Sequence, residues 1–263
     1  MSVMSSLSND DHSLRQLTQT ADDSQARWIP AGPPTLPSLP DHPPPSGNHP
    51  AWRAAIDAAD RKAPGCSLPT LWQDLVRGSV RAWRQSIGPE RVLFLAWLDA
   101  TDPRPCPGDL GILVRVLSGD PQKGIAFDLG TATSTISGRY ARALSGFDLS
   151  PRNVPLIVVL AAQGFSGVGS ILTGRSCVVD HQGSSCRVVS VPRPMTHRMP
   201  GLTQAEQAVA QGIIEGYSRF EIARRRATSV NTVARQVHSI FSALQITGRF
   251  SLIRRAIELD CFG

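Results

Sequence analysis

The sequence has very little lysine: Lys62 and Lys123 are the only two, so arginine carries nearly all of its positive charge. Its five cysteines are an odd number without a Cys-x-x-Cys pair, which argues against a disulfide framework or a zinc ribbon. The six histidines do not stand at metal-ligand spacing from cysteines or acids, so no metal or other cofactor is expected. The sequence also lacks a nucleophile elbow and a phosphate-binding loop, so we expect no enzyme and no catalytic residues.

Long hydrophobic runs are missing as well. The stretch from Asn153 to Gly174 carries no charge, but its apolar part, Val154 to Ala162, is far shorter than the about 20 residues that a transmembrane helix needs. No basic segment followed by an apolar one marks a signal peptide at the N-terminus. These absences predict a buried core helix at 154–162 and a cytoplasmic protein without a membrane partner.

The first 50 residues are polar and then rich in proline. Such a segment buries too little apolar surface to offset the entropy of ordering it. We therefore expect residues 1–50 to form a disordered arm, which contains nine of the prolines: Pro30, Pro33, Pro34, Pro37, Pro40, Pro43, Pro44, Pro45 and Pro50.

The positive charge is concentrated at the other end of the chain. The formal net charge of the whole chain is +6, and residues 198–263 contain nine arginines against five acidic residues. Clustered positive charge attracts a polyanion, because each neutralised phosphate releases a condensed counterion. Charge alone favours the simpler interpretation, an arginine-rich solvated surface.

Between these two ends of the chain, the same order of patterns occurs twice: a helix, a β-hairpin and then further helices. A helical pattern at Thr70–Arg77 precedes β-like runs at Val80–Gln85 and Arg91–Leu98, separated by a Gly-Pro turn signal at 88–89. Helical periodicity follows from Leu110 to Leu149. The apolar run at 154–162 is then followed by a predicted hairpin, 176–180 and 187–191 turning through Gly183, and by helical patterns to the end.

The helical parts of the two copies align at a separation of 97 residues. Val116-Leu117-Ser118-Gly119 matches 213–216, Ile125-Ala126 matches 222–223, and Thr135-Ile136 matches 232–233. The predicted fold is therefore mostly α with short β-hairpins: an internal duplication of two helix-turn-helix units, each preceded by a hairpin. The predicted boundaries are 1–50, 51–150, 151–197 and 198–263.

The last segment carries clear signals for the starts and ends of helices. Thr203 with Glu206, and Ser218 with Glu221, have the spacing of capping boxes, and Ser229 is placed to cap a third helix. Gly216 can end the first helix in the left-handed conformation. A fourth amphipathic pattern carries Phe250, Ile253, Ala256 and Ile257. Four short helices with a tight turn between the second and third are typical of a helix-turn-helix domain.

The third helix has an apolar and a polar face. Val233, Val237 and Ile240 fall at helical spacing, so the opposite face carries Asn231, Ala234, Arg235 and His238. In the major groove arginine can bind guanine O6 and N7, and asparagine can read adenine. Thr232 and Gln236 can donate to phosphates. Candidate DNA-binding residues are thus Asn231, Thr232, Ala234, Arg235, Gln236 and His238.

Residues 202–252 resemble the LuxR/NarL (GerE-type) helix-turn-helix family without a gap. The family pattern is matched at ten positions: Leu202, Thr203, Glu206, Gly216, Ser218, Glu221, Ile222, Ala223, Thr232 and Val233. The resemblance covers about one quarter of the chain. It implies a four-helix domain that binds paired half-sites on double-stranded DNA as a homodimer through its last helix.

Five positions depart from the family pattern. Arg226, Ala227 and Thr228 replace a leucine, a glycine and an aliphatic residue that normally pack the turn, so we expect a looser or differently filled turn. Ala234 replaces the usual lysine and Gln236 the usual histidine, which removes one phosphate or base contact.

The earlier copy, Gly124–Leu144, resembles the same family and also the region-4 helix-turn-helix of sigma factors. It keeps Leu129 and Gly130 at the turn, but Gly138 stands where Arg235 stands in the second copy. Residues 108–150 contain four basic and four acidic residues. Direct DNA contact by this copy would fall to Arg139 and Arg142.

The sequence thus predicts a transcriptional regulator that reads DNA with a recognition helix at about 229–244. Two alternatives remain: a protein-interaction or anti-activator module whose helix-turn-helix units are relics, and a sigma-like factor. RNA polymerase is a further candidate partner.

Overall fold

The computed structural model describes residues 65–87, 91–97, 105–168, 173–181, 184–197 and 199–259, which form a mostly helical protein with one antiparallel sheet. The predicted arm at 1–50 lies outside the described residues. The elements follow one another as β1 (Gly65–Ser67), α3 (Leu68–Arg77), β2 (Arg81–Ile87), β3 (Arg91–Trp97), α4 (Pro107–Leu117), α5 (Gln122–Asp128), α6 (Thr133–Ser145), α7 (Leu156–Phe165), β4 (Thr173–His181), β5 (Ser184–Pro192), α8 (Gln204–Glu215), α9 (Arg219–Arg225), α10 (Val230–Leu244) and α11 (Arg249–Glu258).

Helix α3 begins two residues earlier than its apolar pattern predicts. The hydroxyl of Ser67 accepts a hydrogen bond from the backbone N–H of Thr70, and Pro69 occupies the first turn, where its missing N–H costs nothing. Gly78, at φ +73°, ends the helix in the left-handed conformation. Leu71 and Leu75 are buried on the face that packs against α7.

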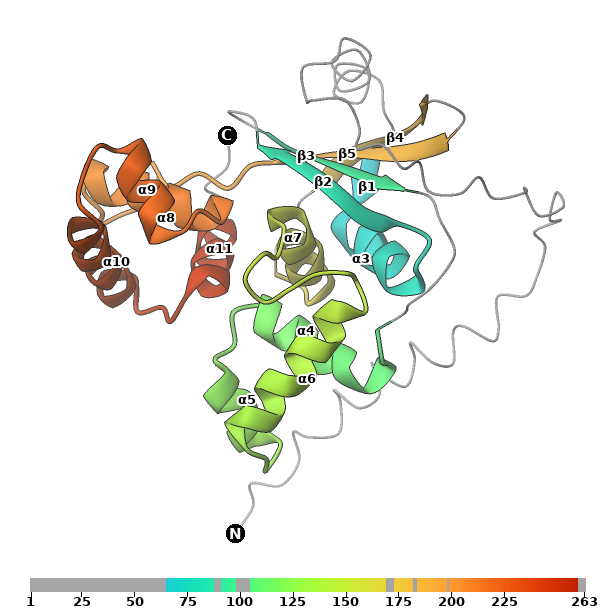
Figure 1. Cartoon of the computed structure of the whole chain (residues 1–263), viewed down its shortest axis with the longest axis horizontal. Helices are drawn as coiled ribbons and strands as arrows, with labels where there is room; N and C mark the ends of the chain where they lie inside the picture. The colour runs from blue at the N-terminus through green and yellow to red at the C-terminus, as the bar shows by residue number, and fades with distance from the viewer. Residues whose placement is uncertain are drawn as a thin grey trace, which may run out of the picture. The chain divides into compact units, whose positions relative to one another are not determined.

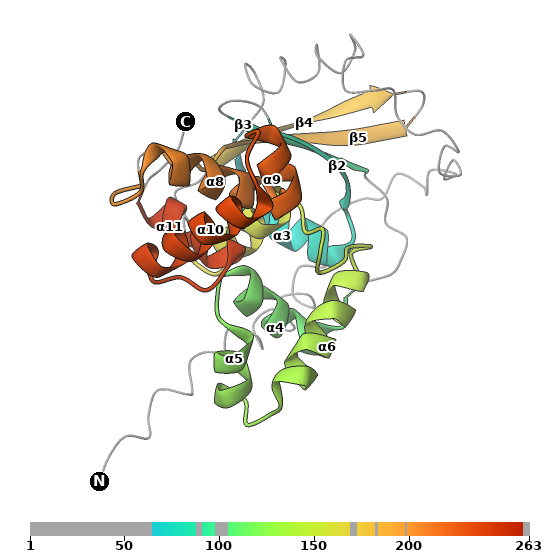
Figure 2. The ribbon, with the colours of Figure 1, turned by 60° about the vertical axis from the view of Figure 1, so that its left-hand side comes forward.

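Both predicted hairpins are present, but they belong to a single sheet of order β1-β4-β5-β3-β2. The two hairpins meet through their second strands, because β3 pairs antiparallel with β5 from Arg91↔Pro192 to Trp97↔Cys186. In Figures 1 and 2, α3 and α7 lie together against one face of this sheet. The pairing of β3 with β5 joins segments about 95 residues apart, which local turn signals could not predict.

Helix α7 is the centre of the core, as its uncharged apolar run predicts. Every residue from Leu156 to Gly164 is buried. The backbone N–H of Ile157 donates to Oε1 of Gln85 on β2 at 3.0 Å, so a strand side chain satisfies part of the helix start. None of the described helices has the length and apolar character required to cross a membrane.

The helices on either side of α7 form two three-helix units with matching boundaries. Helices α4, α5 and α6 start at residues 107, 122 and 133, and α8, α9 and α10 start at 204, 219 and 230, a constant separation of 97. The turns match as well. Gly119 (φ +96°) corresponds to Gly216 (φ +92°), and Gly130 (φ +59°) corresponds to Ala227 (φ +49°).

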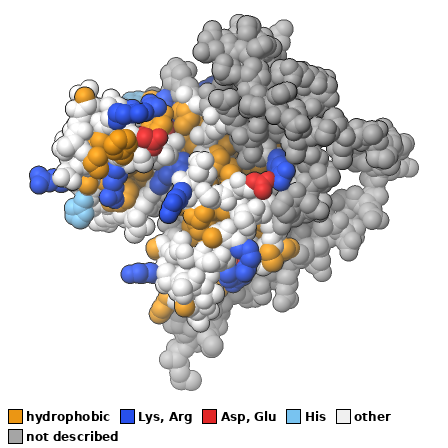
Figure 3. Space-filling model, in the orientation of Figure 1, with side chains coloured by type: hydrophobic (Ala, Val, Ile, Leu, Met, Phe, Trp, Pro, Cys, Tyr) orange, Lys and Arg blue, Asp and Glu red, His pale blue; other side chains and the backbone are white. Residues whose placement is uncertain are grey.

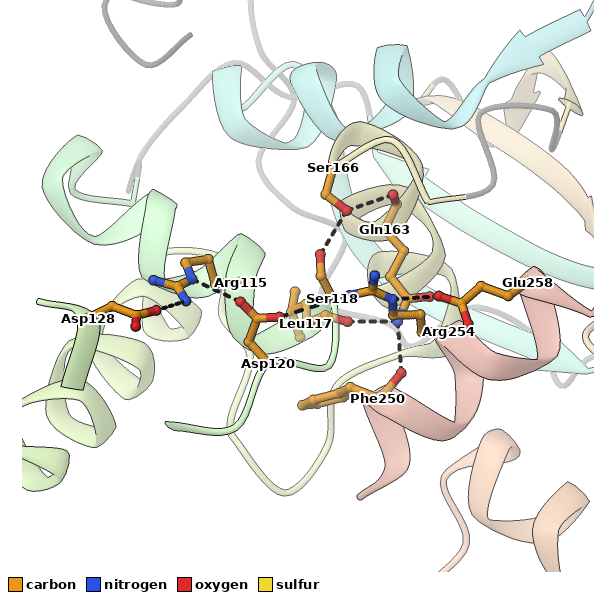
Figure 4. Close-up of polar contacts among 10 residues, drawn as sticks. All are labelled: Arg115, Leu117, Ser118, Asp120, Asp128, Gln163, Ser166, Phe250, Arg254 and Glu258. Atoms are coloured by element: carbon orange, nitrogen blue, oxygen red, sulfur yellow. Dashed lines mark hydrogen bonds and ion pairs between the residues drawn. The ribbon is translucent and has the colours of Figure 1, made fainter. Parts of the chain in front are cut away.

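A polar network connects the end of α4 with α7 and α11 (Figure 4). The buried amide of Gln163 donates from Nε2 to the carbonyls of Leu117 at 2.8 Å and Phe250 at 2.9 Å. Asp120, just after α4, accepts from Arg115 at 2.9 Å and lies 3.9 Å from Nη1 of Arg254. Because a buried amide loses its hydration, these bonds favour one arrangement of the three helices.

Candidate nucleic-acid interface

The C-terminal unit starts with the first predicted capping box. The Thr203 hydroxyl accepts from the backbone N–H of Glu206 at 3.3 Å, and the Glu206 carboxylate accepts from the backbone N–H of Thr203 at 3.0 Å. Ser239 of α10 donates to the same carboxylate at 2.6 Å, and this bond, with the Thr203 contacts, lowers the pKa of Glu206 below its usual value. The cap of α8 therefore also fixes α10 beside it.

The chain packs on α8 before the predicted domain start at residue 198. The Thr196 hydroxyl donates to the carbonyl of Gln207 at 2.6 Å, and Arg193 forms an ion pair with Glu215. Met199 is buried in the core. The connection from the sheet to α8 is thus part of the packed unit.

Helix α9 begins with the second predicted capping box. The backbone N–H of Ser218 donates to the Glu221 carboxylate at 2.8 Å, and the Ser218 hydroxyl accepts from the backbone N–H of Glu221 at 3.2 Å. The bond from the Ser218 hydroxyl is the main reason that the pKa of Glu221 lies below its usual value. Ile222 and Ala223 of α9 are buried.

A side-chain contact spans the turn between α9 and α10. Nη1 of Arg226 donates to Oε1 of Gln236 at 2.8 Å, so two of the departing residues contact each other across the turn. Ala227 has a φ of +49°, in the left-handed region that costs an L-residue about 1–2 kcal/mol. A glycine would adopt this conformation without that cost.

The residues of α10 that are predicted to face the core are buried. Ser229 caps it, accepting from the backbone N–H of Thr232 at 3.0 Å. Val233 and Ile240 are fully buried and Val237 is 5% exposed. The valines therefore face the core of the unit, and the opposite side of α10 faces solvent.

The candidate residues differ in exposure. Asn231, Thr232, Arg235 and His238 are exposed, and no hydrogen bond or ion pair holds the Arg235 guanidinium among the described residues. Ala234 and Gln236 are half-buried. The Thr232 hydroxyl lies 2.9 Å from the Ser229 hydroxyl, and the carbonyl of the Gln236 amide is occupied by Arg226. Gln236 therefore keeps both Nε2 donors for another partner.

The preceding helix, α9, carries further arginines. Arg219 and Arg224 of α9 are exposed, and the Arg225 guanidinium stacks on the Tyr217 ring at 3.9 Å from its centroid. On the face seen in Figure 3, blue patches of basic side chains predominate over red ones on the α8–α11 unit. Such a surface can attract and position a polyanion.

The candidate residues of the first unit have a different environment. Nε of Arg139 donates to Asp109 at 2.7 Å and Nε of Arg142 donates to it at 2.6 Å. The carboxylate of Asp109 is 2% exposed, and these bonds, led by that from Arg142, lower its pKa. Both arginines therefore neutralise a buried charge, a role that their positions in the sequence did not indicate.

The sequence pattern also did not indicate Arg249 as a functional candidate. This first residue of α11 donates to the carbonyls of Ile214 at 3.1 Å and Val154 at 2.7 Å, beside the buried Tyr140 of α6. No local motif places these residues together, because they come from four separate segments: α6, the chain before α7, α8 and α11.

No protein-family model matches the sequence, and no curated protein or solved structure matches it.

Proposed function

We propose that the protein is a sequence-specific DNA-binding transcriptional regulator that inserts α10 into the major groove. The observation that carries the proposal is the two-sided burial of α10. Val233, Val237 and Ile240 anchor the helix, while Asn231, Arg235 and His238 lie exposed on its other side. An exposed polar face on the third helix of a helix-turn-helix unit is the geometry that reads base edges.

Each candidate has a role suited to its chemistry. Arg235 presents two parallel donors to O6 and N7 of a guanine, and Asn231 pairs with an adenine one turn earlier. His238 lies about one turn further along α10. Thr232 and the Nε2 donors of Gln236 contact phosphates, and the exposed Arg219 and Arg224 add charge there. Phosphate contacts position the helix and base contacts provide the specificity.

We further propose that the chain is an internal duplication. The equal spacing of helix starts and of left-handed turn residues supports it, since both recur at a separation of 97. So does the arrangement of the strands, because each three-helix unit follows a hairpin and the hairpins meet through equivalent strands. A residue-by-residue superposition of 107–145 on 204–242 tests the duplication.

The two units have diverged in their surfaces. Gly138 occupies the place of Arg235 in the first unit, and Arg139 and Arg142 are paired with Asp109. A single reading helix covers only a short half-site. We therefore propose that two chains associate on double-stranded DNA, each supplying one α10, with RNA polymerase as a further partner of a promoter-bound dimer.

A protein-interaction module is the second candidate. It is favoured by the exposed apolar side chains of the first unit, since Phe127 is 87% exposed and Leu129 is 52% exposed. Large apolar side chains gathered on a surface favour a protein partner over DNA.

The test is selection of binding sites from a random duplex library by the full chain, followed by titration of the selected duplex in increasing salt. For a DNA-binding protein, the logarithm of the binding constant falls linearly with the logarithm of the salt concentration. Arg235→Ala should weaken specific binding by about 1–3 kcal/mol, and Arg235→Lys should keep most of the salt dependence while losing base discrimination.

Arg77→Ala is the matched control, because it removes the same charge from the exposed end of α3. Its affinity should remain close to that of the unchanged protein. Equal losses for Arg235→Ala and Arg77→Ala, or enrichment of no sequence, would exclude α10 as a reading helix.

A further inference from the structure

A cavity of about 610 Å³ lies where the first three-helix unit meets the C-terminal unit. Its walls come from both units: α4 and α6 contribute Val116 and Tyr140, while α8, α10 and α11 contribute Ile213, Phe241 and Phe250. A cavity of this volume is large enough for a metabolite-sized molecule. Its walls are mostly apolar and carry a few charged groups.

The charged groups of the walls are predominantly positive. Arg152, Arg219 and Arg249 line the cavity, and Asp120 is the one acidic residue among the described lining residues. The Asp120 carboxylate is already bonded to Arg115 at 2.9 Å (Figure 4). Asp120 therefore does not neutralise the positive charge of the cavity walls. This remaining positive charge favours an anion as the ligand.

Arg249 is the charge placed to hold such an anion. Its Nε and Nη2 donate to the carbonyl of Ile214, at 3.3 and 3.1 Å, and its Nη1 donates to the carbonyl of Val154 at 2.7 Å. A guanidinium has five N–H donors, so one donor on each Nη is left by these bonds. Both partners are neutral, and among the described residues no carboxylate pairs with Arg249. Its burial lowers its pKa to about 10.

Tyr140, beside Arg249, supplies a second uncompensated group to the lining of the cavity. The side chain is 4% exposed, and its hydroxyl is buried with no hydrogen-bond partner in the part of the chain described. Burial raises the pKa of Tyr140 to about 12, while the nearby positive charge of Arg249 acts in the other direction. An unpaired buried hydroxyl costs free energy that a bound polar group can recover.

We propose that this cavity binds a small organic carboxylate with an apolar body. The two oxygens of the carboxylate take the two remaining donors of Arg249, and the apolar body lies against Ile213, Phe241 and Phe250. A phosphate would place further charged oxygens against apolar walls, so the geometry favours a carboxylate. Such a ligand touches α6 of the first unit together with α8, α10 and α11 of the C-terminal unit, and it stabilises the junction between the two units.

This site does not depend on DNA binding, and its test contains no DNA. The full chain is titrated with phenylacetate, with its neutral analogue phenylacetamide and with inorganic phosphate. We expect saturable heat of binding for phenylacetate alone and a melting temperature that rises with its concentration, because a ligand that binds only the folded state stabilises it. An equal response to the amide or to phosphate, or no saturation below about 10 mM, overturns the proposal.

Variants locate the binding within the cavity. Arg152 and Arg219 are exposed on its wall, so Arg152→Gln and Arg219→Gln should each fold and weaken phenylacetate binding by about two- to fivefold. Tyr140→Phe keeps the ring and should also weaken binding. Arg77→Gln on α3 is the control and should not change it. If the three cavity variants bind phenylacetate as Arg77→Gln does, the site is not this cavity.

Arg249 is tested by Arg249→Lys, which keeps the charge but not the fork of donors. Because Arg249 also satisfies the carbonyls of Ile214 and Val154, a purely structural role predicts a lower melting temperature and unchanged phenylacetate affinity. The proposed binding role predicts an affinity loss of about tenfold or more at a temperature where the variant is folded. If Arg249→Lys does not fold, the Arg152, Arg219 and Tyr140 variants decide the question.

Discussion

Nη1 of Arg226 donates a hydrogen bond of 2.8 Å to Oε1 of Gln236, connecting the end of α9 with the middle of α10. Both residues depart from the sequence pattern on which the helix-turn-helix prediction rests. The long side chain of Arg226 reaches across the turn, and the amide oxygen of Gln236 accepts its hydrogen bond.

This relationship predicts energetic coupling between the two side chains. Arg226→Ala and Gln236→Ala should each lower the free energy of unfolding, and the double variant should lose less than their sum by about 0.5–1.5 kcal/mol. Urea unfolding of the four proteins measures the coupling. Strict additivity would mean that the bond contributes nothing to the turn.

Because Ala227 has a left-handed conformation, glycine at this position should not destabilise the protein, as it usually does elsewhere, and can stabilise it. Ala227→Gly removes a backbone cost of about 1–2 kcal/mol and adds about 0.4–1 kcal/mol of unfolded-state entropy, so the melting temperature should stay level or rise. Ala208→Gly, at an exposed position within α8, is the control and should cost about 1 kcal/mol. Thermal unfolding compares them, and equal losses would contradict the assigned conformation.

At Gly119 a glycine is required, and its replacement by alanine should lower the stability of the protein. Gly119 has a φ of +96°, and an added Cβ would lie 2.8 Å from the Cα of Ser251 at the start of α11. Gly119→Ala should therefore destabilise the protein by about 2–4 kcal/mol through backbone strain and overpacking.

Gly138 provides the control for the glycine-to-alanine substitution at Gly119. It lies exposed within α6, and a Cβ there meets no atom within 4 Å, so Gly138→Ala should stabilise the protein by about 0.5–1 kcal/mol. Denaturant midpoints of both variants give the comparison. A tolerated Gly119→Ala would show that the turn after α4 does not press on α11.

The Asp109 carboxylate predicts a pH-dependent stability. Its pKa is lower in the folded protein, chiefly through the bond from Arg142, so its contribution is present above its unfolded pKa and is lost as pH falls through the folded value. Asp109→Asn should cost about 1–3 kcal/mol at neutral pH. The difference from the unchanged protein should shrink below about pH 4.

Urea unfolding at neutral and acid pH measures this difference. Asp148→Asn is the control: its side chain is 57% exposed and its ion pair with Arg81 lies at the surface, so the substitution should change stability little at either pH. A pH-independent effect of Asp109→Asn would assign the loss to packing and not to charge.

The local signals in the sequence were sufficient for the elements of the C-terminal unit. Thr203, Ser218 and Ser229 cap three successive helices because a side-chain oxygen near the first free N–H groups acts within one turn of chain. The burial of Val233, Val237 and Ile240 follows from helical spacing in the same way. Gly119 and Gly216, which the separation of 97 residues aligns, share the left-handed backbone conformation.

Only the tertiary structure could decide which distant groups meet. The pairing of β3 with β5, the burial of Asp109 between Arg139 and Arg142, and the position of Arg249 beside Tyr140 depend on how helices and strands pack across many intervening residues. A sequence records the charge of Arg142 but not the carboxylate that neutralises it. Periodicity and capping act over a few residues, whereas the availability of a charged side chain depends on neighbours that only the folded chain provides.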